Sequence, residues 1–299
     1  MKASCTFLFC VLFSSFAFAQ GYGWWNQKHR WDGITHWTKY MVLSPGYMGP
    51  NALPVPKVFT DTLHPHFQIE TGVEGHFSKG DNTRNVYTNV YLPIASDKVG
   101  LEFFVIPVEY YRMDTLTRDK RRSRDFDGRG YSQGDIYVTT YVQLLKNHKY
   151  WPNLLLSIGI KTASGSNLKA ARFTDTPGYF FDVTFSKKIK NKYWGIKYLV
   201  PIVKVGFYAW QTNRNDYLQD DAVVYGIGFK SGHKFLELES ILAGYYGYIG
   251  NGDQPMVYRL TLRTQLKSMF NFQVRGQLGL EDYNYTSIRI STLFTPRFK

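Results

Sequence analysis

The chain has very few cysteines. Among 299 residues there are only Cys5 and Cys10, and both lie in the first ten positions. Residues 1–19 read as a secretory signal peptide, with an early lysine, a short apolar stretch and the cleavage pattern Ala17-Phe18-Ala19 before Gln20. We therefore expect a mature chain without thiols or disulfides, although it enters a compartment that would permit them. Burial and backbone hydrogen bonds must then hold the exported chain together.

Long hydrophobic runs are also lacking. After the first nineteen residues no stretch of eighteen or more apolar residues occurs, so the sequence predicts no membrane-spanning helix. Acidic residues are scarce, with 23 Asp and Glu against 36 Lys and Arg and a net charge of +13. An export signal argues against a nucleic-acid partner for this charge. Two classes remain, a soluble exported protein and an outer-membrane β-barrel.

Residues 256–280 alternate between apolar and polar side chains. Leu260 and Leu262 fall on one parity, whereas Arg259 and Arg263 fall on the other. Because successive side chains of a strand point to opposite faces, this pattern predicts strands with one apolar and one polar face. Each run has about the 9–11 residues that a tilted strand needs to cross a bilayer.

The same pattern recurs along the chain and predicts an all-β protein, a transmembrane antiparallel β-barrel of about twelve strands. Short connections alternate with long ones rich in Gly, Asn, Asp and charge, as in barrels with short periplasmic turns and longer external loops. Both termini are expected on the periplasmic side. The predicted strands are 66–79, 84–95, 98–112, 133–146, 152–163, 178–189, 194–210, 221–230, 233–247, 255–267, 269–281 and 284–295.

Residues 20–65 do not fit the strand pattern. They carry four tryptophans and then a proline-rich run from Pro45 to Pro56, which forbids regular structure. Disordered segments are poor in large aromatic residues, so we predict a docked arm. It either enters the lumen as a plug or packs across the periplasmic mouth. The predicted organisation is a signal peptide over 1–19, this N-terminal arm over 20–65 and the barrel over 66–299.

Aromatic residues make up 17% of the chain and include 23 tyrosines. In a barrel they would form girdles at both membrane interfaces, although tyrosine also simply favours strands. The candidates near strand ends are Tyr110-Tyr111, Tyr150-Trp151, Tyr193-Trp194, Trp210 and Tyr245-Tyr246.

If the apolar parity faces lipid, the other parity places charges in the lumen. A ladder of basic residues lies on three adjacent C-terminal strands, and carboxylates lie on the strands to either side. Such a wall could select anions, or its charges could pair and fill a closed lumen. Counting from the turn at Ser268, Arg263 should pair with Gln273 and Arg259 with Gln277. The predicted lumen residues are Arg259, Arg263, Lys267, Arg275, Arg289, Glu237, Glu239, Glu70 and Glu74, with Asp135 and Asp182 further round.

One constellation could be catalytic. His76 and Ser78 share a strand face, and Asn85 or Asn89 on the next strand could orient the imidazole. The motif resembles the H-x-S-x-G pattern of outer-membrane phospholipase A and, more distantly, barrel-type lipid A deacylases. Two features depart from that family: Lys79 stands where the family has asparagine, and the parity directs His76 and Ser78 to the lumen rather than to lipid.

A second resemblance covers residues 133–190. Gly134-Asp135, Pro152 to Leu156 and Ile158 to Gly165 resemble the core of the MetA-pathway (phenol degradation) family of barrels, with Ala163 in place of the usual proline. The resemblance implies a small outer-membrane barrel for hydrophobic or small organic compounds, without established catalytic residues.

These observations favour an outer-membrane channel or transporter for small anionic or hydrophobic solutes. The alternatives are an outer-membrane lipid acyl hydrolase using His76 and Ser78, and a closed structural or adhesion barrel. A non-enzymatic role is favoured, with no cofactor and no metal. The expected partners are the solute, outer-membrane lipid and lipopolysaccharide, because the basic loop residues between Arg118 and Arg129 could meet anionic sugars and phosphates. A solvated mobile loop is the other interpretation of that run.

Overall fold

A computed structural model describes residues 21–190 and 195–296. The predicted signal peptide lies outside these residues. The chain divides into two compact units, residues 1–35 and residues 36–299. In the described part of the first unit, helix α2 (Gly23–His29) is followed by a turn in which the Asp32 carboxylate accepts hydrogen bonds from the amides of Ile34 and Thr35. Across the described ranges no helix is long and apolar enough to cross a membrane.

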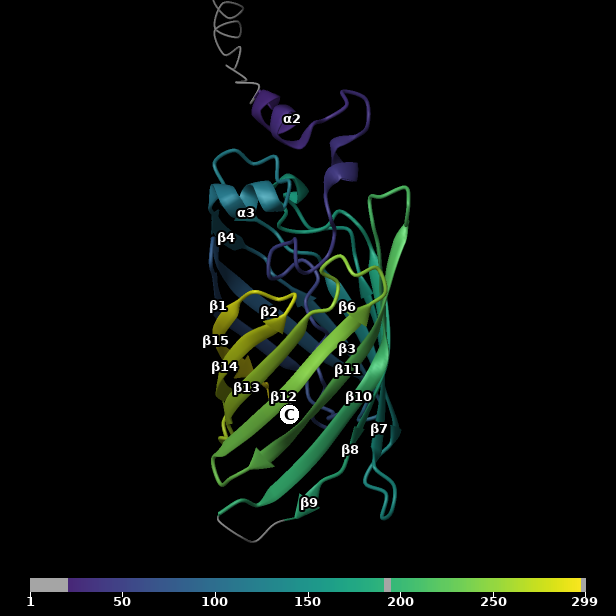
Figure 1. The fold of residues 1–299 in the computed structure, drawn as a ribbon. Coiled ribbons are helices and arrows are strands. Elements are labelled where there is room, and N and C mark those ends of the chain that lie inside the picture. The colour runs from purple at the N-terminus through teal and green to yellow at the C-terminus, as the bar shows by residue number, and fades with distance from the viewer. Residues whose placement is uncertain (1–20, 191–194, 297–299) are drawn as a thin grey trace, which may run out of the picture. The chain divides into compact units, whose positions relative to one another are not determined.

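The second unit is a closed antiparallel β-barrel (Figure 1). Each barrel strand pairs with its neighbour in sequence, and β1 pairs with both β2 and β15, which closes the sheet. Twelve strands form the wall within the described residues, as predicted. They are β1 (Gln68–Ser78), β2 (Asp81–Ala95), β3 (Val99–Val105) continued by β4 (Glu109–Met113), β5 (Arg129–Ser132) continued by β6 (Tyr137–Leu145), β7 (Asn153–Lys161), β8 (Gly178–Ser186), β10 (Tyr198–Gln211), β11 (Gln219–Gly232), β12 (Leu236–Gly247), β13 (Met256–Thr264), β14 (Phe270–Glu281) and β15 (Thr286–Phe294).

The third and fourth wall strands are each interrupted once. The predicted strand 98–112 is split between β3 and β4 at Pro107, because proline has no N–H to donate to the ladder. Across from it, the break between β5 and β6 spans residues 133–136. A short strand β9 (Ile189–Lys190) pairs with the beginning of β10, and short helices η1 (Trp37–Tyr40), α3 (Thr115–Lys120) and η2 (Leu168–Ala170) lie outside the wall strands.

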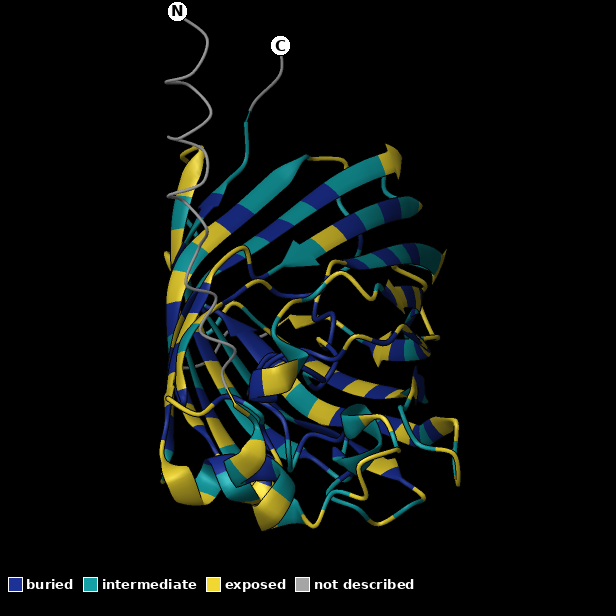
Figure 2. Ribbon diagram, turned by 90° about the horizontal axis from the view of Figure 1, so that it is seen from above, coloured by how far each residue is buried: buried dark blue, intermediate teal, exposed yellow. Residues whose placement is uncertain are grey.

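Burial alternates along the wall strands, which Figure 2 shows as bands of colour. On β13 and β14 the predicted apolar residues, such as Leu260 and Val274, are exposed on the outside. Their polar neighbours, such as Thr261 and Gln273, are buried. The parity prediction is therefore confirmed, and the outer surface is the apolar one.

Most connections confirm the predicted alternation of loop length, but the connection 187–197 between β8 and β10 is longer than the predicted short turn 190–193. One end of the barrel, the long-loop mouth, carries loops 114–128, 162–177, 212–218 and 248–255. The other end, the short-turn mouth, carries turns 96–98, 146–152, 233–235 and 265–269. Two further connections at the long-loop mouth, 79–80 and 282–285, are short as well.

Four of the seven predicted girdle residues that the structure describes are exposed. Tyr110, Tyr150, Trp151 and Tyr246 are exposed, whereas Tyr111, Trp210 and Tyr245 are buried inside the barrel. Alternation explains the split pairs Tyr110-Tyr111 and Tyr245-Tyr246, since two adjacent residues of one strand point to opposite faces, whereas Tyr150 and Trp151 lie in a turn. The predicted pair at positions 193–194 lies outside the described residues.

Candidate functional site

The interior of the barrel contains a segment of the chain itself. Residues 41–67, called here the lumen segment, precede β1 and have no helix or strand. Many of their side chains are buried, including Leu53, Val55 and Val58, which belong to one apolar cluster with inward-facing Tyr137 and Trp210 of the wall. Residues of the lumen segment thus pack inside the barrel wall.

Backbone carbonyls of the lumen segment accept hydrogen bonds from wall side chains. An extended, proline-rich segment cannot hydrogen-bond its own carbonyls. Buried carbonyls without donors would destabilise the fold. Eight such bonds, 2.7 to 3.3 Å long, join the described residues. The pairs are Trp210 to Leu43, Tyr137 to Ala52, Tyr245 to Leu53, Arg259 to Val55 and to Pro56, Lys204 to Lys57, Lys146 to Leu63 and Tyr91 to His64.

The lumen segment crosses the whole barrel. Near β1 it meets the short-turn mouth, where the amide of Leu63 donates to the Gln143 side chain. At its other end, the Ser44 hydroxyl donates to the carbonyl of Asn251 in a long loop, and Arg122 of another long loop donates to the Tyr40 carbonyl. The prediction that both termini lie on one side is therefore wrong for the second unit, whose first residues lie at the long-loop mouth. Its C-terminal strand ends at the short-turn mouth.

The basic ladder has the predicted register, with Arg259 opposite Gln277 and Arg263 opposite Gln273. Most of its charges face carboxylates. Arg275 lies 2.6 Å from Glu74, Arg289 lies 3.3 Å from Glu70, and Arg263 lies 3.7 Å from Glu237. Glu239 instead accepts a hydrogen bond from Thr60 of the lumen segment. Lys267, beyond the end of β13, is exposed. The wall around the ladder is thus largely charge-balanced.

Arg259 differs from the other ladder arginines, because its guanidinium bonds Gln277 and the two carbonyls of Val55 and Pro56. We expect Arg259→Ala to loosen the lumen segment. Hydrogen bonds from a charged donor contribute about 1.5–3 kcal/mol each, so amide exchange over residues 51–63 should accelerate about ten- to hundredfold. Hydrogen exchange followed by mass spectrometry measures this effect.

Arg263→Ala is the matched control. Its guanidinium contacts Gln273 and Glu237 of the wall, so it removes the same charge without touching a segment carbonyl. Equal exchange in the two variants would show that Arg259 does not hold the lumen segment.

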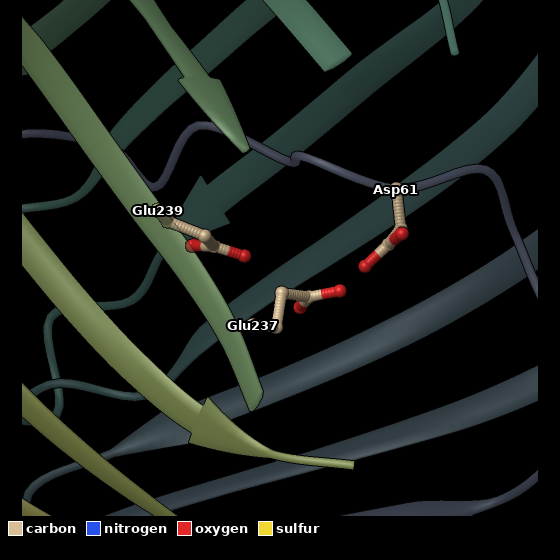
Figure 3. Close-up of side chains that lie close together, drawn as sticks. All are labelled: Asp61, Glu237 and Glu239. Carbon is tan, nitrogen blue, oxygen red and sulfur yellow. The ribbon is translucent and has the colours of Figure 1, made fainter. Parts of the chain in front are cut away.

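Figure 3 shows three carboxylates that turn toward one another, Asp61 of the lumen segment and Glu237 and Glu239 of β12. Basic groups already surround them. Lys230 contacts Asp61 and lies 3.5 Å from Glu237. We therefore interpret this cluster as the charge contact that anchors the lumen segment near the short-turn mouth. A second anchor is the ion pair of Lys57 with Glu102, at 2.8 Å.

Sequence reasoning missed an ion network below the long-loop mouth. Arg172, fully buried, lies 2.7 Å from both Asp81 and Glu109 and donates to the Thr83 hydroxyl. Although burial by itself lowers the pKa of Arg172, the carboxylates of Glu109 and Asp81 raise that pKa above its ordinary value. These partners are 63 and 91 residues away in sequence, so no local pattern could have revealed them.

The same network includes Arg121, which donates to Asp81 and to the Tyr285 hydroxyl. Asn51 of the lumen segment donates to Glu109. The prediction that the basic run of this loop is solvated or faces anionic lipid is wrong for Arg118 and Arg121, because both are buried. Carboxylates inside the barrel attract this part of the loop. Gly49 is required here, since a Cβ would lie 2.7 Å from the Arg172 guanidinium carbon.

His76 faces the lumen, as its parity indicated, but the structure does not bring it together with Ser78 and Asn89. The Ser78 hydroxyl donates to the Asp81 carbonyl. The two imidazole nitrogens hydrogen-bond Ser287 at 2.7 Å and Asn85 at 3.0 Å instead. An asparagine of the next strand does orient the ring, but it is Asn85. Asn89 lies further along β2, opposite Glu70.

The residues of the second resemblance meet in space. Asp135 lies 2.8 Å from Lys161 and accepts a hydrogen bond from the amide of Gly165. Both charged side chains are fully buried. They tie the loop after β7 to the break between β5 and β6. Asp182 also faces inward and pairs with Lys204 at 2.8 Å. Lys204 lies between Val203 and Val205, and a single lysine between two valines of a strand could have indicated this inward partner.

Two cavities lie along the lumen segment. One, of about 100 Å³, is lined by residues 54–57, by His76 and Arg275 and by several aromatic rings. The other, of about 120 Å³, is lined by residues 57–61, Glu70 and Arg263. Lys57 of the segment and Tyr87 and Arg259 of the wall line both cavities, so the two chambers adjoin along the segment within one lumen.

The fold has counterparts among solved structures. An outer-membrane channel of the COG4313 group from Pseudomonas putida F1 superposes with a TM-score of 0.54 at 11% identity, covering 81% of this chain and 100% of that one. This chain has the fold of an outer-membrane β-barrel. A KdgM porin, in complex with disordered oligogalacturonate, is similar with a TM-score of 0.48 at 10% identity, covering 77% of this chain and 99% of that chain. No family model and no curated protein matches the barrel described here.

Proposed function

We propose that this protein is an outer-membrane channel for small organic solutes, closed by its own lumen segment in the conformation described and conducting when the segment moves. The two cavities that adjoin the segment carry the proposal. A water needs only about 10–15 Å³ of such volume and a few polar partners, so each chamber holds several waters. Displacing the segment would join the chambers into one path through the barrel.

The contacts of the lumen segment are suited to such movement. It contributes no strand to the sheet, so it can leave the lumen without breaking a backbone ladder. When the lumen segment leaves, the charges of the wall remain balanced except at a few residues. Arg259 would lose its two carbonyls and has no carboxylate partner of its own among the described residues, whereas Arg275 keeps Glu74.

The charge and the aromatic rings of that wall indicate which solutes to expect. An arginine exposed in the open lumen favours anions. Aromatic rings of Tyr87, Phe104 and Phe180 line one chamber and suit apolar surface. Small organic anions with an apolar or aromatic body fit both features. The resemblance to the MetA-pathway barrels points to the same kind of compound, and a barrel of this kind belongs in the outer membrane.

A disulfide between the lumen segment and the wall tests the proposal. A Cβ built on Gly226 of β11 lies 2.9 Å from a methyl carbon of Val58, which suits a disulfide between Val58→Cys and Gly226→Cys. In planar bilayers, we expect the natural chain to open intermittently, the oxidised double variant to stay closed, and a reductant to restore its openings. Each single cysteine variant is the control.

Two results would contradict this function. Openings that are equally frequent in the oxidised and reduced double variant would show that solutes do not need the segment to move. If neither the natural chain nor the reduced variant ever conducts, a closed structural barrel becomes the better account. The hydrolase alternative with Ser78 as nucleophile is disfavoured, since the His76 ring bonds Ser287 and Asn85 and the Ser78 hydroxyl bonds the Asp81 carbonyl.

A further inference from the structure

Three arginines face outward on the lipid side of the barrel, near the long-loop mouth. They are Arg84 on β2, Arg112 on β4 and Arg129 on β5, and all three are exposed. Among the outward positions of the described strands, arginine occurs at these three. Arginine on the lipid face of a barrel is destabilising in the middle of the bilayer and tolerated near its interfaces. Their clustering near the long-loop mouth therefore indicates a membrane interface there.

Two of these arginines face each other. In the ladder between β4 and β5, Arg112 is paired with Arg129. Directly opposite side chains have Cβ atoms about 4.5–5.5 Å apart, and like charges there destabilise the pairing of strands. An anion between the two guanidiniums turns that repulsion into attraction, and a phosphate suits the planar fork of arginine especially well.

An apolar groove of about 550 Å³ lies beside them on the outer face. Its lining includes Val73 and Gly75 of β1, Val86 and Arg84 of β2, Val108 just before β4 and Ile288 of β15. The hollow is open at Gly75, because this residue, which is paired with Arg84 on β2, has no side chain to fill it. Charge and apolar surface are thus arranged side by side, with the paired arginines nearer the long-loop mouth than the groove.

We propose that the outer face of β1, β2, β4 and β5 binds a phosphorylated, acylated glycolipid of the outer leaflet. An acyl chain occupies the groove beside Gly75, and a phosphate lies between Arg112 and Arg129, with Arg84 within reach of the same headgroup. Long loops mark the external end of such barrels, so the arginines are at headgroup depth in the outer leaflet. This site is separate from the lumen and does not depend on the proposed channel.

Thermal unfolding of the purified full chain in nonionic detergent tests the proposal. We expect diphosphorylated lipid A to raise the melting temperature of the natural chain more than dephosphorylated lipid A does, and inorganic phosphate to leave it unchanged. The variant Arg112→Gln/Arg129→Gln should bind lipid A at least about tenfold more weakly. Without lipid it should be as stable as the natural chain or more stable, because the like-charge contact is gone.

Lys98→Gln/Lys234→Gln is the matched control, since both lysines are exposed at the short-turn mouth and their loss changes the net charge equally. It should bind lipid A as the natural chain does. Gly75→Val should weaken binding of both lipid A forms by filling the groove. Its Cβ meets only the far edge of the Phe77 ring, at 3.0 Å, so the barrel should still fold. Equal affinity of the arginine variant and the natural chain, or equal effects of the two lipid A forms, would overturn the proposal.

Discussion

Replacing Arg172 by methionine is expected to lower the free energy of unfolding by about 3–5 kcal/mol, because it leaves buried carboxylates without their main cation. Asp81 and Glu109 each lie 2.7 Å from this guanidinium, and both carboxylates are fully buried. Asp81 retains Arg121, so Glu109 should bear most of the cost. Denaturant titration of the detergent-folded barrel, followed by its heat-modifiable gel mobility, measures the change.

Arg214→Met is the control for this substitution. Arg214 lies 2.7 Å from Asp216, the same distance, but both side chains are partly exposed on a long loop. Exposed ion pairs contribute about 0–1 kcal/mol, so this variant should remain close to the natural chain. A similar small loss for both variants would mean that the network below the long-loop mouth is accessible to water or rearranges easily.

The second large effect concerns the side of the membrane on which the N-terminal residues lie. The lumen segment runs from the short-turn mouth to the long-loop mouth, and Ile34 precedes His36, the first residue of the barrel unit, by two positions. We therefore expect a cysteine at Ile34, which is 91% exposed, to react with a membrane-impermeant maleimide on intact cells. Labelling on intact cells should be complete if residue 34 lies outside and absent if it lies in the periplasm.

Few changes are needed for this experiment, because both natural cysteines lie in the predicted signal peptide. Asn215→Cys in a long loop should label on intact cells, and Lys98→Cys in a short turn should label only after lysis. Labelling of Ile34→Cys only after lysis would show that the lumen segment does not deliver the N-terminal residues to the outside.

The strands and their orientation could be predicted from the sequence. Alternation with a period of two is local, so it locates each strand and separates its lipid face from its lumen face. The tight turn at Ser268 sets the register of β13 against β14, which is the register observed. Loop lengths likewise indicated which connections share an end. The break at Pro107 falls inside a predicted strand, because only the pairing partners decide how a strand accommodates proline.

The contents of the lumen were decided by the tertiary structure. Residues 41–67 have no period, and their proline-rich backbone binds whatever donors the closed wall presents, so their route could not be derived from the pattern. His76 bonds Ser287, 211 residues away, because β1 closes against β15. Sequence alone determined which charges face inward. Closure of the barrel determined which charge each one meets, because pairing partners in a lumen are set by distances across strands far apart in the chain.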